Sequence, residues 1–418
     1  MTKFRQAQAA QARQKTNLIL AGVSRNFKKS TAAGRYEDAL KYAIQALRIA
    51  PNLPVARADA AFSLLKLGRW EDAIGQAKLV AEMENPPLTA LDVLAHAYGE
   101  LQQAEEVRTW GLRALAQRDR MFGAATVQRL GFTLPPAPTP ETRHLNLIAF
   151  SLFGQSPKYC EVAVLNAERR QAIYPDWTCR FYVDETVPAP VLERLKGFGA
   201  EVVTVDPEMR SWPGPMWRFA ACDSPGLQRV IFRDADSVIS EREARCVSAW
   251  VKSPHGFHHM RDYATHTELL LAGLWGCVGG SLPPMRDMIA RFLKKPVERA
   301  HFADQFFLRE YVWPYARQDI LHHDSTFGAF NADPFPDGPT ERTFHVGCVD
   351  AVRASISADF PDGTEVEWTL HDGKDLNRLR CRYRGQVQNG QVDAMLPRDY
   401  IEDIRCGRAI ARCRPAQN

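Results

Sequence analysis

The spacing of apolar side chains divides the chain into a helical N-terminal part and an alternating middle part. Over much of residues 1–120 the sequence aligns with itself at a shift of 34 residues. The correspondence is clearest where GRYEDAL, with Gly34, Tyr36 and Ala39, recurs as GRWEDAI, with Gly68, Trp70 and Ala73. Small residues at fixed positions let paired helices approach closely, and a proline ends the second helix of each pair. The pattern predicts a stack of helix pairs.

This repeat resembles the tetratricopeptide repeat, and the resemblance implies a helical domain over 1–132. A third, weaker unit follows at Leu88–Gln117, where Gln102 takes the glycine position. The last unit of such a stack has to present a polar outer face, so degeneracy is expected there. The resemblance leaves three roles open: binding a protein or peptide partner, stiffening the neighbouring domain, or self-association.

A proline-rich linker at 133–143 precedes a change of pattern to alternating strands and helices. This alternation predicts an α/β domain over 144–360 with a mostly parallel sheet. Expected strands are 144–153, 178–183, 201–205, 228–232, 269–278 and 343–347, with helices at 159–174, 190–198 and 303–311.

The last part of the chain, 361–418, is predicted to be a small β-rich appendage. Polar and apolar residues alternate in TEVEWTL and RLRCRYR, and Asn389–Gly390 indicates a tight hairpin turn. Pro397 is expected to begin a short helix that Gly407 closes.

Two aspartates follow a short apolar strand of the α/β domain. Asp234 and Asp236 follow Val230–Phe232, a continuous apolar run typical of a strand covered on both faces. Ligands of open α/β sheets bind at the carboxyl ends of the strands. Two carboxylates there can hold a divalent cation and, through it, a diphosphate. The alternative is that the pair only begins a turn or caps a helix.

The order of these landmarks resembles that of glycosyltransferases of the GT-A fold, especially the glycogenin type. Asp-x-Asp follows the fourth strand, Asp304–Gln305 opens a late helix, and TFHVG comes last. The resemblance, which covers roughly 144–350, implies a Rossmann-like domain that uses a nucleotide-sugar donor. The sequence departs from the family's longer motif after Gly347, where Cys348 follows.

Several roles are implied by that resemblance. It assigns a metal site to Asp234, Asp236 and His345, and backbone approach to the diphosphate to Gly347. Asp304 and Gln305 would contact the transferred sugar as catalytic residues, which favours retention of configuration. Arg218, just before the fourth strand, would bind the donor's phosphate or ribose, because a guanidinium matches such oxygens. Asp304 as a helix cap and Arg218 as a buried ion-pair partner are the structural alternatives.

Charge and composition narrow the class of partners. The formal net charge is only +4, which gives no reason to expect a nucleic-acid partner. Nine cysteines without a Cys-x-x-Cys spacing are typical of reduced thiols. No secretory signal and no run of about 20 apolar residues are present, so no transmembrane segment is expected. A cytoplasmic location follows, either free or peripheral at the inner face of the membrane.

Arginines crowd the C-terminal end of the chain. They would either form the solvated face of a strand or face an anionic substrate or membrane surface. These residues are Arg378, Arg380, Arg382, Arg384, Arg405, Arg408, Arg412 and Arg414.

The sequence therefore predicts a glycosyltransferase that depends on Mn²⁺ or Mg²⁺ and takes a UDP- or GDP-sugar. Its acceptor would be a glycan, glycoconjugate or protein, as in surface polysaccharide biosynthesis. Two alternatives stay open. One is a non-catalytic scaffold with a relic α/β domain. The other is a haloacid-dehalogenase-type phosphatase, in which Asp234 would be the nucleophile.

Overall fold

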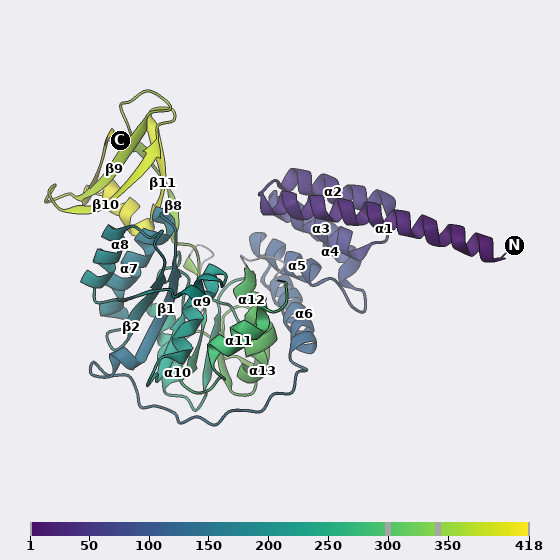
Figure 1. Cartoon of the computed structure of the whole chain (residues 1–418), viewed down its shortest axis with the longest axis horizontal. Helices are drawn as coiled ribbons and strands as arrows, with labels where there is room; N and C mark the ends of the chain where they lie inside the picture. Colours follow the sequence, from purple (N-terminus) through teal and green to yellow (C-terminus); the bar gives the residue numbers. More distant parts are fainter. Residues whose placement is uncertain (1, 297–301, 339–343, 417–418) are drawn as a thin grey trace. The chain divides into compact units, whose positions relative to one another are not determined.

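The computed structural model describes residues 2–296, 302–338 and 344–416, which form two compact units (Figure 1). The first unit contains the chain up to Ala124 together with two short segments from later in the sequence, Asp262–Leu269 and Asp324–Ala332. The second unit contains the remaining residues, including the proline-rich linker. No helix among the described residues combines the length and apolar character that crossing a bilayer requires.

Six helices build the first unit. They are α1 (Thr2–Ala32), α2 (Tyr36–Ile49), α3 (Pro54–Lys66), α4 (Trp70–Ala81), α5 (Leu88–Glu100) and α6 (Ala104–Phe122). Consecutive helices pack in pairs, and alanines such as Ala61, Ala73 and Ala95 are fully buried between them. Small side chains at these positions are what lets neighbouring helices approach closely.

The predicted 34-residue repeat is confirmed in the turns between helices. Gly34, Gly68 and Gln102 have φ of 69°, 73° and 57°, in the left-handed region. Each turn repeats one hydrogen bond, in which the amide after this residue donates to a carbonyl five residues earlier. These bonds join Arg35 to Ser30, Arg69 to Leu64 and Gln103 to Tyr98. Gln102 therefore occupies the glycine position of a third unit, as the sequence predicts.

Two later segments of the chain complete the core of this helical unit. Phe327 fills the space beside Gly111, where a Cβ would lie 2.1 Å from its ring, and Ala264 lies against Gly99 in the same way. The guanidinium of buried Arg118 binds Asp92 at 2.7 Å. No sequence pattern indicates that residues so far along the chain belong with the repeats.

The second unit is built on a seven-stranded mixed sheet in the order β3-β2-β1-β4-β6-β5-β7. Pairs β1–β2, β2–β3 and β1–β4 are parallel, whereas β4–β6 and β5–β6 are antiparallel. The strands are β1 (Asn146–Leu152), β2 (Thr178–Val183), β3 (Glu201–Thr204), β4 (Arg229–Phe232), β5 (Phe257–Arg261), β6 (Trp275–Val278) and β7 (Ile320–Asp324).

Both faces of this sheet are covered, which explains the continuous apolar runs. All residues of β1 and β4 are buried. One face packs on α7, α8 and α10, and the other carries the aromatic cluster of Phe219, Phe232, Trp275 and Phe307. The helices are α7 (Pro157–Ile173), α8 (Ala189–Gly197), α9 (Pro207–Arg210), α10 (Glu241–Val251), α11 (Met285–Phe292), α12 (Ala303–Phe307) and α13 (Trp313–Ala316). Short 3-10 helices lie at Arg143–Leu145 and Gly214–Asp223, and a π-helical turn at Leu308–Val312. A further 3-10 helix, Ala329–Asn331, belongs to the first unit.

Three sequence predictions are wrong in detail. The strand expected at 269–278 begins only at Trp275 and runs antiparallel to β4. Gly276 lies directly against the β4 backbone at Val230. The helix expected at 303–311 changes to a π-helical turn after Phe307. Of the strand expected at 343–347, Thr343 lies outside the described residues and the rest forms a turn with Gly347 at φ 84°.

A β-rich module ends the chain, as predicted. Sheet β10-β9-β12 lies beside the antiparallel pair β8–β11, and Asn389 and Gly390 make the hairpin turn. Its elements are β8 (Ala351–Ser357), β9 (Glu365–Asp372), β10 (Leu379–Gln386), β11 (Gln391–Pro397), α14 (Arg398–Arg405) and β12 (Ala409–Pro415). Strand β8 was not predicted. The fully buried carboxylate of Glu161 on α7 accepts a 2.6 Å hydrogen bond from Tyr383, which fastens the module to the α/β domain.

The repeat turns provide a stability test. Gln102→Gly should stabilise the helical unit by about 1 kcal/mol, because a side chain in the left-handed region costs roughly that much. Gly68→Ala should destabilise it by a similar amount, since only backbone conformation opposes the methyl group there. Urea denaturation of both variants measures these free energies of unfolding. Equal stabilities of the two variants and the parent would contradict the assignment.

Candidate functional site

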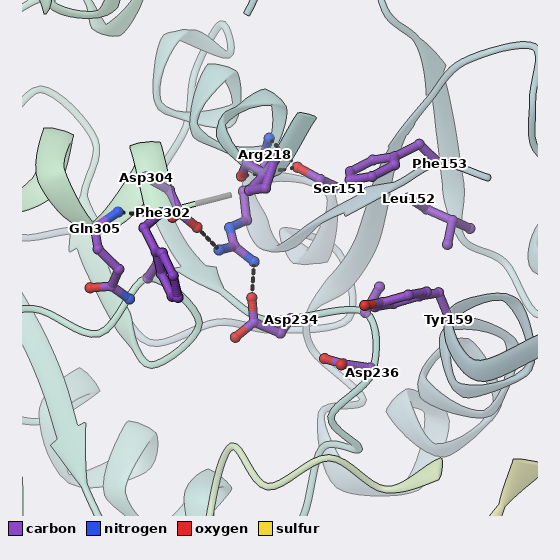
Figure 2. Close-up of a pocket in the computed structure, with 13 residues that line it drawn as sticks. Ser151, Leu152, Phe153, Tyr159, Arg218, Asp234, Asp236, Phe302, Asp304 and Gln305 are labelled. Atoms are coloured by element: carbon purple, nitrogen blue, oxygen red, sulfur yellow. Dashed lines mark hydrogen bonds and ion pairs between the residues drawn. The ribbon is translucent and has the colours of Figure 1, made fainter. Parts of the chain in front are cut away.

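A cavity of about 330 Å³ opens at the carboxyl ends of β1 and β4 (Figure 2). Because β1 and β4 are parallel neighbours, the residues after them meet at one edge of the sheet. Ser151 comes from the end of β1, and Asp234 and Asp236 come from the turn after β4. Both aspartates line the cavity, as the sequence predicts.

The guanidinium of Arg218 links two carboxylates that lie far apart in the sequence. Its Nη1 donates to Asp234 Oδ1 at 2.5 Å and its Nη2 to Asp304 Oδ2 at 2.9 Å. Ser151 Oγ accepts the backbone N–H of Arg218 at 2.9 Å and so holds its chain in place. Burial alone would lower the pKa of Arg218, but the charges of Asp234 and Asp304 outweigh it and raise the pKa. The guanidinium is therefore a permanent positive charge at the cavity.

A second base engages the second aspartate. Lys158, in the first turn of α7, places Nζ 2.9 Å from Asp236 Oδ2. Burial lowers the pKa of Lys158, whereas the hydrogen bond and charge of Asp236 raise it, and the net effect is a raised pKa. The ammonium also lies over the ring of Tyr159, another residue of the cavity wall.

The two aspartates differ in how far they face solvent. The side chain of Asp234 is 47% exposed and that of Asp236 is 17% exposed. Figure 2 shows Asp234 with one oxygen on Arg218 and the other turned into the cavity. With Asp304, the cavity wall carries three carboxylates and the Arg218 guanidinium, and Lys158 contacts Asp236 without lining the cavity itself. Together these five groups leave one negative charge in excess.

A missing side chain makes room for Asp234. A Cβ at Gly273 would lie 2.2 Å from Asp234 Oδ2, so only glycine allows the carboxylate to lie where it does. The glycine-rich stretch before β6 therefore determines where the Asp234 carboxylate can lie in the site. Nothing in the sequence connects Gly273 with Asp234.

Gln305 belongs to the cavity wall but has structural partners. In the amide orientation that satisfies both groups, its Nε2 donates to Leu270 O at 2.9 Å and its Oε1 accepts from Ala272 N at 2.8 Å. The backbone N–H of Gln305 also donates to Asp304 Oδ1. These bonds fix the 270–272 loop and Asp304 relative to each other. Gln305 therefore acts here as a support for Asp304.

His345 and Gly347 lie in the segment beside the Asp-x-Asp turn but do not line the cavity. The amide of Asp350 donates to Asp236 O at 2.8 Å, and Val346 packs with Leu274. A Cβ at Gly347 would lie 2.9 Å from Leu274, so close packing against Leu274 explains why a glycine is needed here. Across residues 2–296, 302–338 and 344–416, no three His, Cys, Asp or Glu side chains are grouped as a metal site. The expected trio with His345 is thus not assembled in this conformation.

The donor set nevertheless fits a hard divalent cation. Mg²⁺ and Mn²⁺ are commonly held by one or two carboxylates, with phosphate oxygens and waters completing the shell. Asp234 and Asp236 offer two carboxylates on one short turn, and the cavity has a surplus negative charge. A cation at Asp236 would be opposed by the ammonium of Lys158, which already contacts Oδ2 of the same carboxylate.

Sequence reasoning missed Lys158, Tyr159, Ser151 and Gly273. The only signal for the first two is Pro157, which begins a helix directly after the first predicted strand. First-turn side chains of such a helix lie near the carboxyl ends of the strands. The pairing of Lys158 with Asp236, however, depends on the packing of α7 and appears only in the structure.

Comparison with known proteins identifies the repeats and little else. A family model described as tetratricopeptide repeat matches residues 30–88. No curated protein matches the chain. Among solved structures, the first tetratricopeptide domain of human RPAP3 is 19% identical, with 23% of this chain and 77% of that one covered and a TM-score of 0.23.

Glycosyltransferase structures are also among the matches. A variant of the Thermobaculum terrenum O-GlcNAc transferase is 14% identical, with a TM-score of 0.28, and the match covers 46% of this chain and 42% of that one. Mycobacterium tuberculosis glucosyl-3-phosphoglycerate synthase, solved with Mn²⁺, UDP and glucosyl-3-phosphoglycerate, is 12% identical, with a TM-score of 0.30 and coverage of 48% and 76%. Similarities this low carry no argument about the activity of the present chain.

Competition between Lys158 and a cation can be measured directly. Lys158→Met should tighten binding of Mn²⁺ alone by roughly fivefold, since a partly exposed ion pair contributes up to about 1 kcal/mol. Isothermal titration with MnCl₂ gives the affinity, and Lys196→Met, at an exposed position of α8, is the matched control. Unchanged Mn²⁺ affinity in Lys158→Met would show that Asp236 is not a ligand.

Proposed function

We propose that the second unit is a glycosyltransferase that takes its sugar from a nucleotide-diphosphate donor. The observation that carries this proposal is the cavity at the carboxyl ends of β1 and β4. Three carboxylates and two bases from four separate segments converge there, with one negative charge in excess. Such a site suits a cation together with a diphosphate better than either alone.

Sugar transfer requires stabilisation of negative charge on the nucleoside diphosphate and of positive charge on the sugar ring. Cleavage of the sugar–phosphate bond leaves negative charge on the departing nucleoside diphosphate. A divalent cation, Mn²⁺ or Mg²⁺, supplies Lewis-acid neutralisation of that charge when it is bound. In the proposal Asp234 and Asp236 hold it, with His345 as a third ligand once the segment 344–350 moves towards them.

The bases of the cavity complete this arrangement. Lys158, when released from Asp236, lies within reach of the same diphosphate and adds a positive charge to it. Arg218 keeps Asp234 and Asp304 in fixed positions, because its guanidinium bonds to both. It can also approach a donor phosphate, although its two ion pairs make positioning its first role.

Asp304 is proposed to face the transferred sugar. Its carboxylate is nearly buried at the cavity wall, and both of its oxygens are oriented, one by Arg218 and one by the Gln305 amide. A fixed carboxylate can stabilise positive charge that develops on the sugar ring. Retention of configuration and backbone contact of Gly347 with the diphosphate belong to the same proposal.

The helical unit is proposed to bind a protein partner or a protein acceptor, or a second copy of the chain. The donor is proposed to be a UDP- or GDP-sugar, and the acceptor a glycan, glycoconjugate or protein. A cytoplasmic site of action in polysaccharide assembly is part of this proposal.

One observation is compatible with the non-catalytic alternative as well. Both aspartates already have basic partners, which is also how a relic site would look. The two proposals differ in one measurable respect, because a relic site would bind neither cation nor nucleotide. No contact in the described residues favours the phosphatase alternative.

The decisive experiment is a thermal-shift panel followed by turnover. UDP, GDP and their sugars are added with Mn²⁺ or with a chelator, because a ligand that binds only the folded protein raises its melting temperature. One nucleotide should raise the melting temperature, and only with Mn²⁺. Hydrolysis of the corresponding nucleotide sugar should then be measurable.

Asp236→Ala should lower that hydrolysis by roughly 100-fold or more, since removal of one charge-stabilising group has that effect in other enzymes. Asp184→Ala, at the end of β2 and outside the cavity, is the matched control and should keep its activity. The melting temperature of each variant verifies that it folds. Full turnover by Asp236→Ala, or no nucleotide that stabilises the parent protein, would refute the proposal.

A further inference from the structure

The C-terminal module presents a sheet face on which arginines lie in register. In the central strand β9, Val366, Trp368 and Leu370 point into the module and are at most 1% exposed. The alternate residues Glu367 and Thr369 therefore point to the opposite face, because side chains alternate along a strand. They are 17% and 8% exposed on that face. The outward residues of the flanking strands β10 and β12 share this face.

Two neighbouring cross-strand rows carry four arginines. Arg382 of β10 and Arg412 of β12 both pair with Thr369. Arg384 and Arg414 pair in the same way with Glu367. These four residues, here called the arginine face, stand about 7 Å apart along a strand and about 10 Å apart across β9.

Positive charge is in excess on these two rows. Among their six residues only Glu367 carries a negative charge, and it is shared by Arg382 at 3.3 Å and Arg414 at 2.6 Å. Glu365 lies one row further out, opposite Gln386. Elsewhere in the module, Arg353 pairs with Asp393.

The next row in the other direction is aliphatic. Leu379 and Ile410 both pair with His371 and are 40% and 38% exposed. The adjoining β9–β10 hairpin adds Leu376, which is 38% exposed, within the exposed stretch Lys374–Arg378 that also contains Asp375. Exposed aliphatic side chains therefore lie directly beside a field of positive charge.

We propose that this face docks on the surface of an anionic lipid bilayer. The arginine face would contact lipid phosphates, while Leu379 and Ile410 would enter the boundary between head groups and acyl chains. A basic patch combined with apolar side chains is what interfacial binding requires. A soluble polyanion would neutralise the arginines but would leave the aliphatic row in water. The sequence also allowed the arginines to be simply the solvated face of a strand. That alternative does not explain why exposed aliphatic side chains lie beside them.

The inference does not depend on the proposed transferase activity. The arginine face belongs to the C-terminal sheet and does not line the cavity at β1 and β4. Loss of bilayer binding and loss of nucleotide binding are therefore separately measurable.

The test is flotation of the full chain with vesicles. Vesicles of phosphatidylcholine with 30% phosphatidylglycerol are compared with vesicles of phosphatidylcholine alone. The full chain should float only with the anionic vesicles, and binding should weaken as salt rises, because screening shortens the reach of surface charge. An arginine near an anionic surface changes partitioning by roughly fivefold. The double variant Arg382→Gln with Arg412→Gln should therefore lose roughly 25-fold.

Matched variants distinguish an effect of the arginine face from an effect of the protein's overall charge. Arg245→Gln with Arg353→Gln removes the same charge from two exposed positions outside the arginine face and should float like the parent. Leu379→Ser with Ile410→Ser should lose roughly tenfold while all charges are kept. The melting temperature of each variant verifies that it folds.

Three results would overturn the proposal. The first is that the parent protein does not float with anionic vesicles. The second is that the Arg245 and Arg353 control loses as much binding as the arginine-face variant. The third is that soluble polyphosphate binds the arginine face while vesicles do not, which would assign the face to a soluble polyanion.

Discussion

The ion pairs around Arg218 are the constraint on which the candidate site depends. The guanidinium is buried to 2% exposure, and burial of a charge is costly unless partners compensate for it. Asp234 and Asp304 provide this compensation, and they come from the end of β4 and the start of α12. One side chain therefore fixes the distance between the Asp-x-Asp turn and the helix that carries the third carboxylate.

The same electrostatic balance determines what the cavity can bind. Removing either aspartate would leave the buried guanidinium with one carboxylate partner instead of two, so the carboxylates stabilise the fold as well as the site. Lys158 is 27% exposed, against 2% for Arg218, and it pairs with one carboxylate instead of two, so its ion pair is the weaker one. The cavity thus combines a rigid half at Arg218 with an adaptable half at Lys158. A cation and a diphosphate can be accommodated by rearranging the adaptable half alone.

The helical repeats and the C-terminal module are held together by different kinds of contact. The helical repeats are held by small buried side chains and by turns with one repeated hydrogen bond. Two later segments complete the core of the repeats, so the repeats and the α/β domain cannot be separated by a single cut in the sequence. The C-terminal module is fastened through buried Glu161 and leaves the outer face of its sheet to solvent.

The sequence by itself determined the local features. The 34-residue spacing located the repeat turns, including Gln102, because left-handed turns and close helix packing restrict individual positions. Apolar runs located β1, β2 and β4, since strands buried on both faces need continuous apolar residues. The aspartates at the end of β4 were found because the end of a strand is visible in the sequence, as the point where the apolar run stops. The Asn389–Gly390 turn and helix α14 were predicted for the same reason.

Only the tertiary structure decided which distant residues meet. The pairing of Lys158 with Asp236, the space that Gly273 leaves for Asp234, and the place of Phe327 beside Gly111 all join positions dozens to hundreds of residues apart. The direction of β6 and the row of arginines on β10 and β12 likewise depend on strand register. Periodicity and composition describe neighbours along the chain, whereas these contacts result from packing of the whole fold, which a single sequence does not encode in any local pattern.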